Sequence, residues 1–345
     1  MNREERRQGK QKYIISNIVY GSIYPQLWLE NQCKSLCDPT NIPALKEKYD
    51  VEYCLFTDEP TLQAISRHPH WMQLSQICPI NVVKMHWPPD ADQFASRYGL
   101  LVQMFHQMLS VALEKNAWLS VWVADLVFAK HALPRMLNRL ENGHDAVFNV
   151  PIRSAADSVN PLLARLPGAP SDLELFEMAY ANLHHLWVAS HWDAPMFSKF
   201  PYSMLWNSGT GLCTHHFGIT PIVFKPTEEM KSVKGVIDAD VPEFCKNPFW
   251  AKDWIDAPVA GVEPLSNGHY PPFRQHKADP DWVVEWSRVG TIFGQSKNLD
   301  KSLYYPSEKT FNNPEIAKQS QEIADKIKSS IEEKYHAEQA KPDNV

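Results

Sequence analysis

Two aspartates follow short apolar runs, at points where we expect β-strands to end. Asp58 comes after Thr57 at the end of the run 51–56, and Asp125 follows the run 118–123. In a site for a nucleotide diphosphate, one carboxylate can accept from a base or ribose hydroxyl, and another can hold a divalent cation against the phosphates. Either aspartate could instead cap a helix or turn the chain. Each alone favours that structural role, but the two together favour a ligand site.

Arg97 lies just before the clearest helical pattern of the chain, an apolar stripe at spacings of three and four over 100–113. The start of a helix offers free N–H groups and a positive dipole end, which attract anions. An arginine there adds a bidentate partner for phosphate. Arg97 is therefore a candidate phosphate ligand, with a solvated side chain as the alternative.

Histidines and acids also gather in the second half. His215 and His216 precede a predicted strand at 222–224, and Asp238 and Asp240 follow in a predicted loop. Asp-x-Asp with a nearby histidine is a reasonable ligand set for a hard or borderline metal ion. The pattern is short enough to arise by chance, so its specificity is weak.

The elements that must position these residues alternate along the first 150 residues. Apolar runs predict strands at 13–20, 51–56, 79–83, 118–123 and 146–150. Helical patterns lie between them, at 24–37, 61–67, 100–113 and 133–140. This alternation predicts an α/β fold with a doubly wound, parallel sheet covered on both faces. The ligands of such sheets bind at the carboxyl ends of the strands.

The later part of the chain breaks this alternation. Helices are predicted at 171–187, at 281–290 and from 315 to about 339, the last as a surface or protruding helix. We expect a flexible arm at 1–11, a ligand-binding half at 12–150, a second half of the same domain at 151–305, and a charged helix and tail at 306–345.

The composition narrows the function classes. The 345 residues carry a net charge of −6, which disfavours a basic nucleic-acid surface. The six cysteines form no CxxC pair and predict reduced thiols in the cytoplasm. No apolar run reaches the roughly 18 to 20 residues that a membrane span needs. The chain lacks GxGxxG, GxxxxGK[ST] and GxSxG, which disfavours a nicotinamide enzyme, a P-loop nucleotidase and an α/β hydrolase.

The order of several short phrases resembles a known family. A strand ends in Tyr20-Gly21, "NIPAL" follows, a second strand ends in Thr57-Asp58, "SRYGLLVQM" opens a helix, and a strand runs into "ADLVF". This order resembles the nucleotide-binding half of GT-A glycosyltransferases. The phrases "HHFGITPIVFKP", "VIDAD" and "DWVVEWSRVG" resemble those of a bacterial group of glycosyltransferase-like proteins. The resemblance covers about residues 12–305.

The resemblance implies a GT-A, Rossmann-like fold with an acceptor-side extension toward the C-terminus. It also implies a nucleotide site formed by five residues: Tyr20, Gly21, Thr57, Asp58 and Arg97.

GT-A enzymes bind Mn²⁺ or Mg²⁺ through an Asp-x-Asp at the end of the fourth strand. The matching triplet here ends in Asp125 but begins with Val123. The metal would therefore need other ligands, such as His216 or Asp240, or the enzyme would use none.

The implied reaction transfers a sugar from a nucleotide diphosphate to a glycan, a lipid-linked precursor or a protein, with Asp238 or Asp240 as the base. Two alternatives stay open. The chain could be a non-catalytic relative that binds a glycan or protein, as Val123 suggests. It could also be a nucleotidyltransferase, which ranks last because residues 22–27 contain no glycine.

Overall fold

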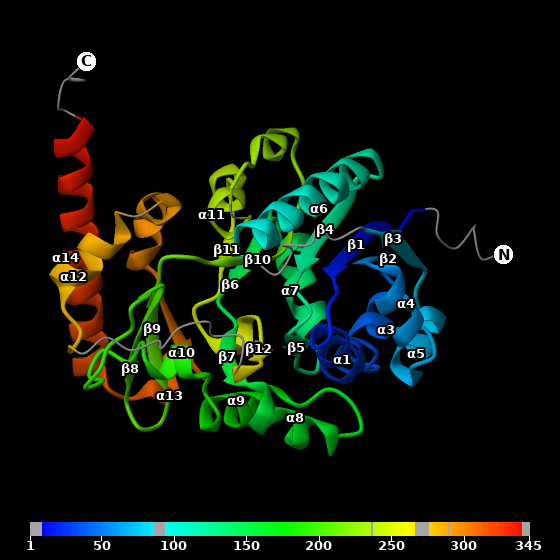
Figure 1. Ribbon diagram of the computed structural model, residues 1–345, viewed down its shortest axis with the longest axis horizontal. Helices are drawn as coiled ribbons and strands as arrows, with labels where there is room; N and C mark the ends of the chain where they lie inside the picture. Colours follow the sequence, from blue (N-terminus) through cyan, green and yellow to red (C-terminus); the bar gives the residue numbers. More distant parts are fainter. Residues whose placement is uncertain (1–8, 86–93, 236, 266–275, 289, 340–345) are drawn as a thin grey trace. The chain divides into compact units, whose positions relative to one another are not determined.

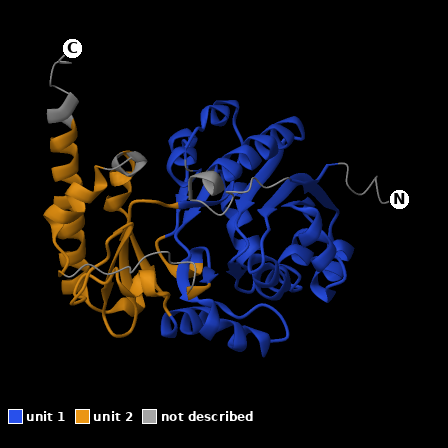
Figure 2. Cartoon of the chain, viewed as in Figure 1, with its two compact units in different colours: residues 1–182, 220–251, 256–263 blue, residues 183–219, 252–255, 264–345 orange. Residues whose placement is uncertain are grey.

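A computed structural model describes residues 9–85, 94–235, 237–265, 276–288 and 290–339. The chain forms two compact units that alternate along the sequence (Figure 2). Unit 1 comprises residues 1–182, 220–251 and 256–263. Unit 2 comprises residues 183–219, 252–255 and 264–345.

A seven-stranded sheet forms the centre of unit 1 (Figure 1). Its strands are β1 (Gln11–Ile18), β2 (Tyr49–Thr57), β3 (Ile80–Lys84), β4 (Ala117–Trp122), β6 (Ala146–Asn149), β10 (Thr220–Phe224) and β11 (Phe249–Trp250). Their order across the sheet is β11-β6-β10-β4-β1-β2-β3. All neighbours are parallel except β10, which is antiparallel to both β4 and β6.

Helices connect these strands. They are α1 (Tyr24–Leu27), the π-helix η1 (Trp28–Cys33), α2 (Lys34–Leu36), α3 (Ile42–Leu45), α4 (Glu59–Ile65), α5 (Pro69–Ile77), α6 (Phe94–Glu114), α7 (Ala132–Glu141), α8 (Ala156–Ala164) and α9 (Asp172–Ala181). Three short helices follow β10, namely η2 (Glu228–Ser232), α11 (Ile237–Asp240) and η3 (Val241–Phe244). The predicted helix over 24–37 is thus one helical run that contains a π segment.

The register of the sheet shows that α6 and α7 cover opposite faces. The ring of Trp118 lies 5.6 Å from that of Tyr49, whose hydroxyl donates to Glu141 at the end of α7 at 2.7 Å. The residue after Trp118 points to the other face and pairs with Phe224. The ring of Phe224 lies 6.2 Å from that of Phe105 in α6. Both faces are therefore covered, as expected for a largely parallel sheet.

A second, three-stranded sheet in unit 1 has the order β5-β12-β7. It consists of β5 (Leu126–Phe128), β7 (Ile152–Ala155) and β12 (Val259–Glu263). The strand β12 is antiparallel to β5 and parallel to β7. This sheet begins one residue after Asp125, so it fixes the chain that leaves β4.

Unit 2 is built on a three-stranded antiparallel sheet of order β13-β9-β8. Its elements are α10 (His185–Val188), β8 (Ser203–Asn207), β9 (Leu212–His216), α12 (Pro280–Ser287), η6 (Gly290–Asp300), β13 (Ser302–Tyr305), α13 (Glu308–Phe311) and α14 (Pro314–Gln339). A further 3-10 turn, η4, spans Trp254–Asp256.

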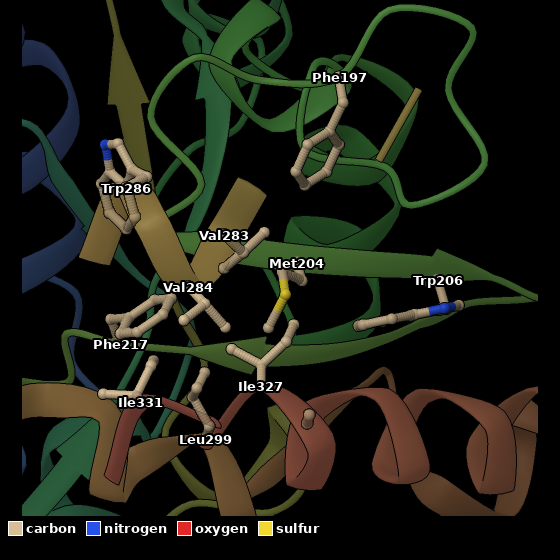
Figure 3. Packing of buried hydrophobic residues seen from close by; sticks show 11 residues of the cluster. Phe197, Met204, Trp206, Phe217, Val283, Val284, Trp286, Leu299, Ile327 and Ile331 are labelled. Atoms are coloured by element: carbon tan, nitrogen blue, oxygen red, sulfur yellow. The ribbon is translucent and has the colours of Figure 1, made fainter. Parts of the chain in front are cut away.

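The core of unit 2 lies between this sheet and the helices α12 and α14 (Figure 3). Met204 and Phe217 come from the sheet and the turn that follows it, Trp286 from α12, and Ile327 and Ile331 from α14. All five side chains are buried. The C-terminal helix therefore contributes to a core, although its charged sequence predicted a surface or protruding helix.

The mixed α/β class and the mostly parallel central sheet with flanking helices are confirmed. The antiparallel β10 and both small sheets were not predicted. The predicted helix over 171–187 ends early, because α9 stops at Ala181 with Asn182 as its C-cap. No helix among the described residues is both long and apolar enough to cross a membrane.

Candidate functional site

The candidate site lies at the carboxyl ends of the parallel strands of the seven-stranded sheet, which we call its carboxyl edge. The parallel strands β1, β2, β4 and β6 end there, and the antiparallel β10 begins there. On one side of β1 the sheet continues with β2 and then β3. On the other side, β1 pairs with β4. The strand order therefore reverses between β1 and β4. Open α/β sheets bind ligands at such a switch point, outside the carboxyl ends of the strands.

A buried network of amide and hydroxyl groups ties these strand ends together. The side-chain amide of Asn17 in β1 donates to the Val123 carbonyl oxygen at 3.0 Å and to Gln32 Oε1 at 2.9 Å. Gln32 Nε2 donates to the same carbonyl at 3.2 Å. The Tyr53 hydroxyl donates to Asn17 Oδ1 and accepts from Trp28 Nε1 at 3.0 Å. The backbone at the end of β4 is thus fixed two residues before Asp125.

Asp125 lies beside a second carboxylate that the sequence reading did not single out. The backbone carbonyl oxygen of Asp125 accepts a hydrogen bond from Val262 N at 2.8 Å. This hydrogen bond places Asp125 next to Glu263, the last residue of β12. Arg153 of β7 holds Glu263 through two guanidinium hydrogen bonds. Asp125 and Glu263 are only 9% and 7% exposed. The small sheet therefore assembles two buried carboxylates and one guanidinium at the end of β4.

The electrostatics of Asp125 follow from this setting. Burial, and then the nearby charge of Glu263, raise the pKa of Asp125 from 3.8 to about 7, while Arg153 lowers it. Carboxyl groups with raised pKa values that lie at sheet edges are candidates for proton transfer or cation binding. Val123, two residues before Asp125, is 40% exposed.

Two nucleotide-binding candidates lie at the end of β2, and one of them has a local structural role. Asp58 is the N-cap of α4, because its Oδ1 accepts from Thr61 N at 2.8 Å. The structural alternative considered for Asp58 is therefore present in the fold. Thr57 is buried, and its hydroxyl has no hydrogen-bond partner in the part of the chain that the structure describes.

The remaining nucleotide-binding candidates lie around the same edge. Tyr20 is half-buried just beyond β1, and Gly21 is exposed with φ +78°, a conformation that favours glycine. Arg97 lies within α6 rather than before it, and its side chain falls outside the described part of the structure. The helix α6 ends at Glu114, just before β4 begins, so its first turns lie toward the carboxyl edge of the sheet.

Asp238 reaches this edge from α11. The hydroxyl of Thr220, the first residue of β10, donates to Asp238 Oδ2 at 3.5 Å. Thr220 pairs with Asn149, the last residue of β6. Burial raises the pKa of Asp238 from 3.8 to about 6, and the hydrogen bond from Thr220 partly offsets this. The fold thus brings Asp125 and Asp238 to the same edge of the sheet.

Asp240 has a different environment. Its Oδ2 accepts from the backbone N–H groups of Gly235 at 2.8 Å and of Lys234 at 3.2 Å. This carboxylate therefore closes a turn. Of the two aspartates predicted as bases, Asp238 has the environment better suited to that role.

His216, predicted as a metal ligand, is buried in β9 of unit 2. Its Nδ1 is 2.8 Å from Ser203 Oγ and its Nε2 is 2.6 Å from Thr214 Oγ1. The neighbouring His215 is 2.8 Å from the Leu299 carbonyl oxygen and 3.3 Å from Ser320 Oγ. Because both nitrogens of each ring have partners within unit 2, these contacts favour a packing role.

A surface hollow of about 410 Å³ lies at the opposite edge of the central sheet, near the start of β2. Its charges are largely paired with each other or with nearby groups. Lys48 lies 3.1 Å from Glu141, and Arg135 lies 2.8 Å from Asp172. The hollow offers no carboxyl group whose pKa is raised, so we place the candidate site at the carboxyl edge.

The most informative residue that the sequence reading missed is Glu263. A glutamate at the end of the apolar run 259–262 was visible in the sequence. Nothing local, however, indicated that β12 pairs with β5 and so carries Glu263 to Asp125 across 138 residues. The role of Asn17 was not predicted, because one polar residue within a predicted strand does not by itself indicate a functional site.

Comparison with known proteins adds little to this geometry. No family model matches the chain, and no curated protein matches it by sequence. One similar solved structure is that of a candidate glucose-1-phosphate thymidylyltransferase from Bacillus anthracis in complex with sucrose. The match has 10% identity and a TM-score of 0.26, and it covers 43% of this chain. The chain spans 57% of that protein, and a match at this level supports no inference about function.

Proposed function

We propose that this protein is a glycosyltransferase that moves a sugar from a nucleotide diphosphate donor to an acceptor hydroxyl. The observation that carries the proposal is Asp125, a buried carboxyl beside Glu263 at the switch point of a mostly parallel sheet. The resemblance of short phrases to GT-A glycosyltransferases points to the same chemistry. The acceptor class, whether glycan, lipid-linked precursor or protein, stays open.

The donor set at this edge fits a divalent cation. Asp125 and Glu263 offer the oxygen ligands that Mg²⁺ and Mn²⁺ prefer. Burial, and then repulsion by Glu263, raise the pKa of Asp125, and a cation would relieve that repulsion. Glu263 thus supplies a second carboxylate where Val123 replaces the first aspartate of the GT-A pattern. When bound, the cation would neutralise charge on the diphosphate leaving group.

The protein's own residues would position the donor and accept the proton of the acceptor. The ends of β1 and β4, fixed by Asn17, would hold the donor against Asp125. The bond between the sugar's anomeric carbon and the phosphate oxygen breaks, and the nucleoside diphosphate leaves with the electron pair. The acceptor oxygen forms the new bond to that carbon, and its proton passes to Asp238, whose pKa of about 6 suits a base near neutral pH.

A thermal-shift panel tests the donor site. UDP, GDP and their sugars, each with and without Mn²⁺, should raise the Tm of the wild type. Asp125→Asn should abolish the part of the shift that depends on Mn²⁺, whereas Asp193→Asn, an exposed site in unit 2, should keep it. A panel that leaves the Tm of the wild type unchanged would refute the proposal.

One observation favours a second candidate, a non-catalytic relative. The exposed Val123 stands where the GT-A pattern has its first aspartate, so only Asp125 of the two motif carboxylates is present. Nucleotide-sugar binding without hydrolysis or transfer, across an acceptor panel of oligosaccharides, lipid-linked sugars and peptides, would favour this candidate. Release of nucleoside diphosphate that depends on both Asp125 and Asp238 would favour the transferase.

A further inference from the structure

A second group of potential metal ligands lies away from the carboxyl edge, between η1 and the start of α5. It consists of Glu30, His68 and His70, all half-buried. Each offers one ligand atom, and the three atoms lie within 4.8 Å of one another. We propose that Glu30, His68 and His70 form a binding site for a zinc-like divalent metal ion. This proposal is independent of the proposed sugar transfer.

The donor types select the class of metal. Two imidazoles and one carboxylate are ligands of zinc and similar borderline ions, and a site with three protein ligands keeps one position open for water or another ligand. Around a tetrahedral zinc ion, ligand atoms lie about 3.3 Å apart, given bonds of about 2 Å. The separations here exceed that value by about 1.5 Å at most, so small side-chain rotations would close the site.

A hydrogen bond to the backbone fixes the ring of His70. Its Nδ1 lies 3.0 Å from the Leu29 carbonyl oxygen and donates to it in the neutral ring. This hydrogen bond leaves Nε2 as the free lone pair, which is the usual way that a backbone carbonyl prepares a metal-binding histidine.

The π-helix η1 supplies both the carboxylate and this carbonyl. Glu30 lies in η1 directly after Leu29, so the same turn carries one ligand and orients another. π-helical turns are rare and frequently occur at functional sites. The pairing of His68 and His70 around Pro69, the first residue of α5, places both rings at one helix start, 5.2 Å apart.

Metal binding would change two contacts of the free chain. His68 Nε2 lies 2.9 Å from Glu30 Oε1, and the ion would replace the proton between them. His68 Nδ1 would then carry the ring's proton and lose its 3.3 Å cap contact with the N–H of His70. Lys34 contributes a nearby positive charge that opposes the ion, although its ammonium group donates to the Leu163 carbonyl oxygen at 2.8 Å.

Isothermal titration of the chelator-treated full chain with ZnCl₂ tests the site. The wild type should bind one high-affinity zinc ion per chain. His68→Asn removes a ligand but keeps a residue that can cap α5, so a loss of binding would not reflect a lost cap. His68→Asn, His70→Gln and Glu30→Gln should each weaken binding by at least about tenfold. His131→Asn is the matched control, since asparagine tolerates the positive φ of that exposed site.

Co²⁺ provides a second measurement that separates this site from the thiols. Cys33, Cys37 and Cys78 are buried in the same region and influence each other electrostatically. Co²⁺ held by Glu30 and the histidines should show a visible d–d spectrum without a thiolate-to-cobalt charge-transfer band. Zinc affinity unchanged in all three variants, the absence of zinc binding by the wild type, or a thiolate band would each overturn the proposal.

Discussion

The side-chain amide of Asn17 donates to the backbone carbonyl of Val123 at 3.0 Å and so joins the ends of β1 and β4, two residues before Asp125. Gln32 donates to the same oxygen at 3.2 Å. A buried amide that makes three hydrogen bonds, as Asn17 does, acts as a rigid spacer, because moving it would leave several polar groups without partners. The two strands that flank the switch point are therefore locked together at the candidate site.

Asn17→Ala should destabilise the protein and weaken donor binding. The substitution removes the acceptor of the Tyr53 hydroxyl proton and the donor to Gln32 Oε1, which costs about 1–3 kcal/mol for each unsatisfied group. Urea denaturation measures this loss, and the thermal shift with UDP and Mn²⁺ measures the effect on binding. Asn138→Ala, at an exposed position of α7, should change stability by less than about 0.5 kcal/mol. Equal effects of the two substitutions would contradict the positioning role.

Asp125→Asn should stabilise the protein increasingly as pH rises. The pKa of Asp125 is about 7 in the folded chain and 3.8 ordinarily, so between these values the folded state holds a proton that the unfolded state has lost. Stability of the wild type therefore falls as the pH rises from about 4 to about 7. Asparagine does not ionise and avoids this loss. The Tm difference between variant and wild type should grow from pH 5 to pH 8, and a constant difference would argue against a raised pKa.

Val123→Asp should strengthen metal-dependent binding of the nucleotide. The side chain is 40% exposed at the end of β4, so an aspartate fits there without burial. Without metal, the new charge near Asp125 and Glu263 should lower the Tm slightly. With Mn²⁺ and UDP, the Tm shift should exceed that of the wild type. Val123→Asn is the neutral control, and an equal shift for both variants would exclude a metal contact at this position.

Unit 2 should lose stability in mild acid because of its buried histidines. Burial lowers the pKa of His215 to about 4 and of His216 to about 3, from the ordinary 6.5. Below pH 6.5 the unfolded chain therefore takes up protons that the folded chain does not, and stability declines as pH falls toward these values. His216→Gln should reduce the difference in stability between pH 7 and pH 5. Urea midpoints at both pH values measure it, and an unchanged difference would contradict a buried neutral His216.

Ile327→Ala should show that α14 belongs to the core of unit 2. Ile327 is fully buried, and truncating such a side chain to alanine costs about 2–5 kcal/mol. Lys326 precedes it and is exposed, so Lys326→Ala should change stability by less than about 0.5 kcal/mol. Thermal unfolding of both variants provides the measurement. A small effect of Ile327→Ala would contradict the core role of α14 and favour the surface helix that its charged sequence predicted.

The sequence predicted those features that depend on neighbours along the chain. The apolar runs 13–20, 51–56 and 118–123 predicted strands of the parallel sheet, because the periodicity and burial of a strand depend on residues close together in the sequence. The alternation of strands and helices gave the α/β class. The place of Asp125 at a strand end followed directly from these two.

Other features depend on pairings between distant segments. The insertion of β10 between β4 and β6 is one, and it brings Asp238 to the carboxyl edge. The approach of Glu263 to Asp125 through β12 is another. The cluster of Glu30 with His68 and His70 at the start of α5 is a third, since nothing local relates Glu30 to His68, 38 positions away.

The sequence by itself therefore determined the central elements of the sheet and the presence of acidic residues at its strand ends. Only the tertiary structure decided which of these acids are desolvated and next to another charge. Strand formation responds to side chains within a few residues, whereas a pKa responds to every charge and every loss of water nearby, wherever in the chain it originates. Asp58, which caps a helix, and Asp125, which lies buried beside Glu263, looked alike in the sequence for this reason.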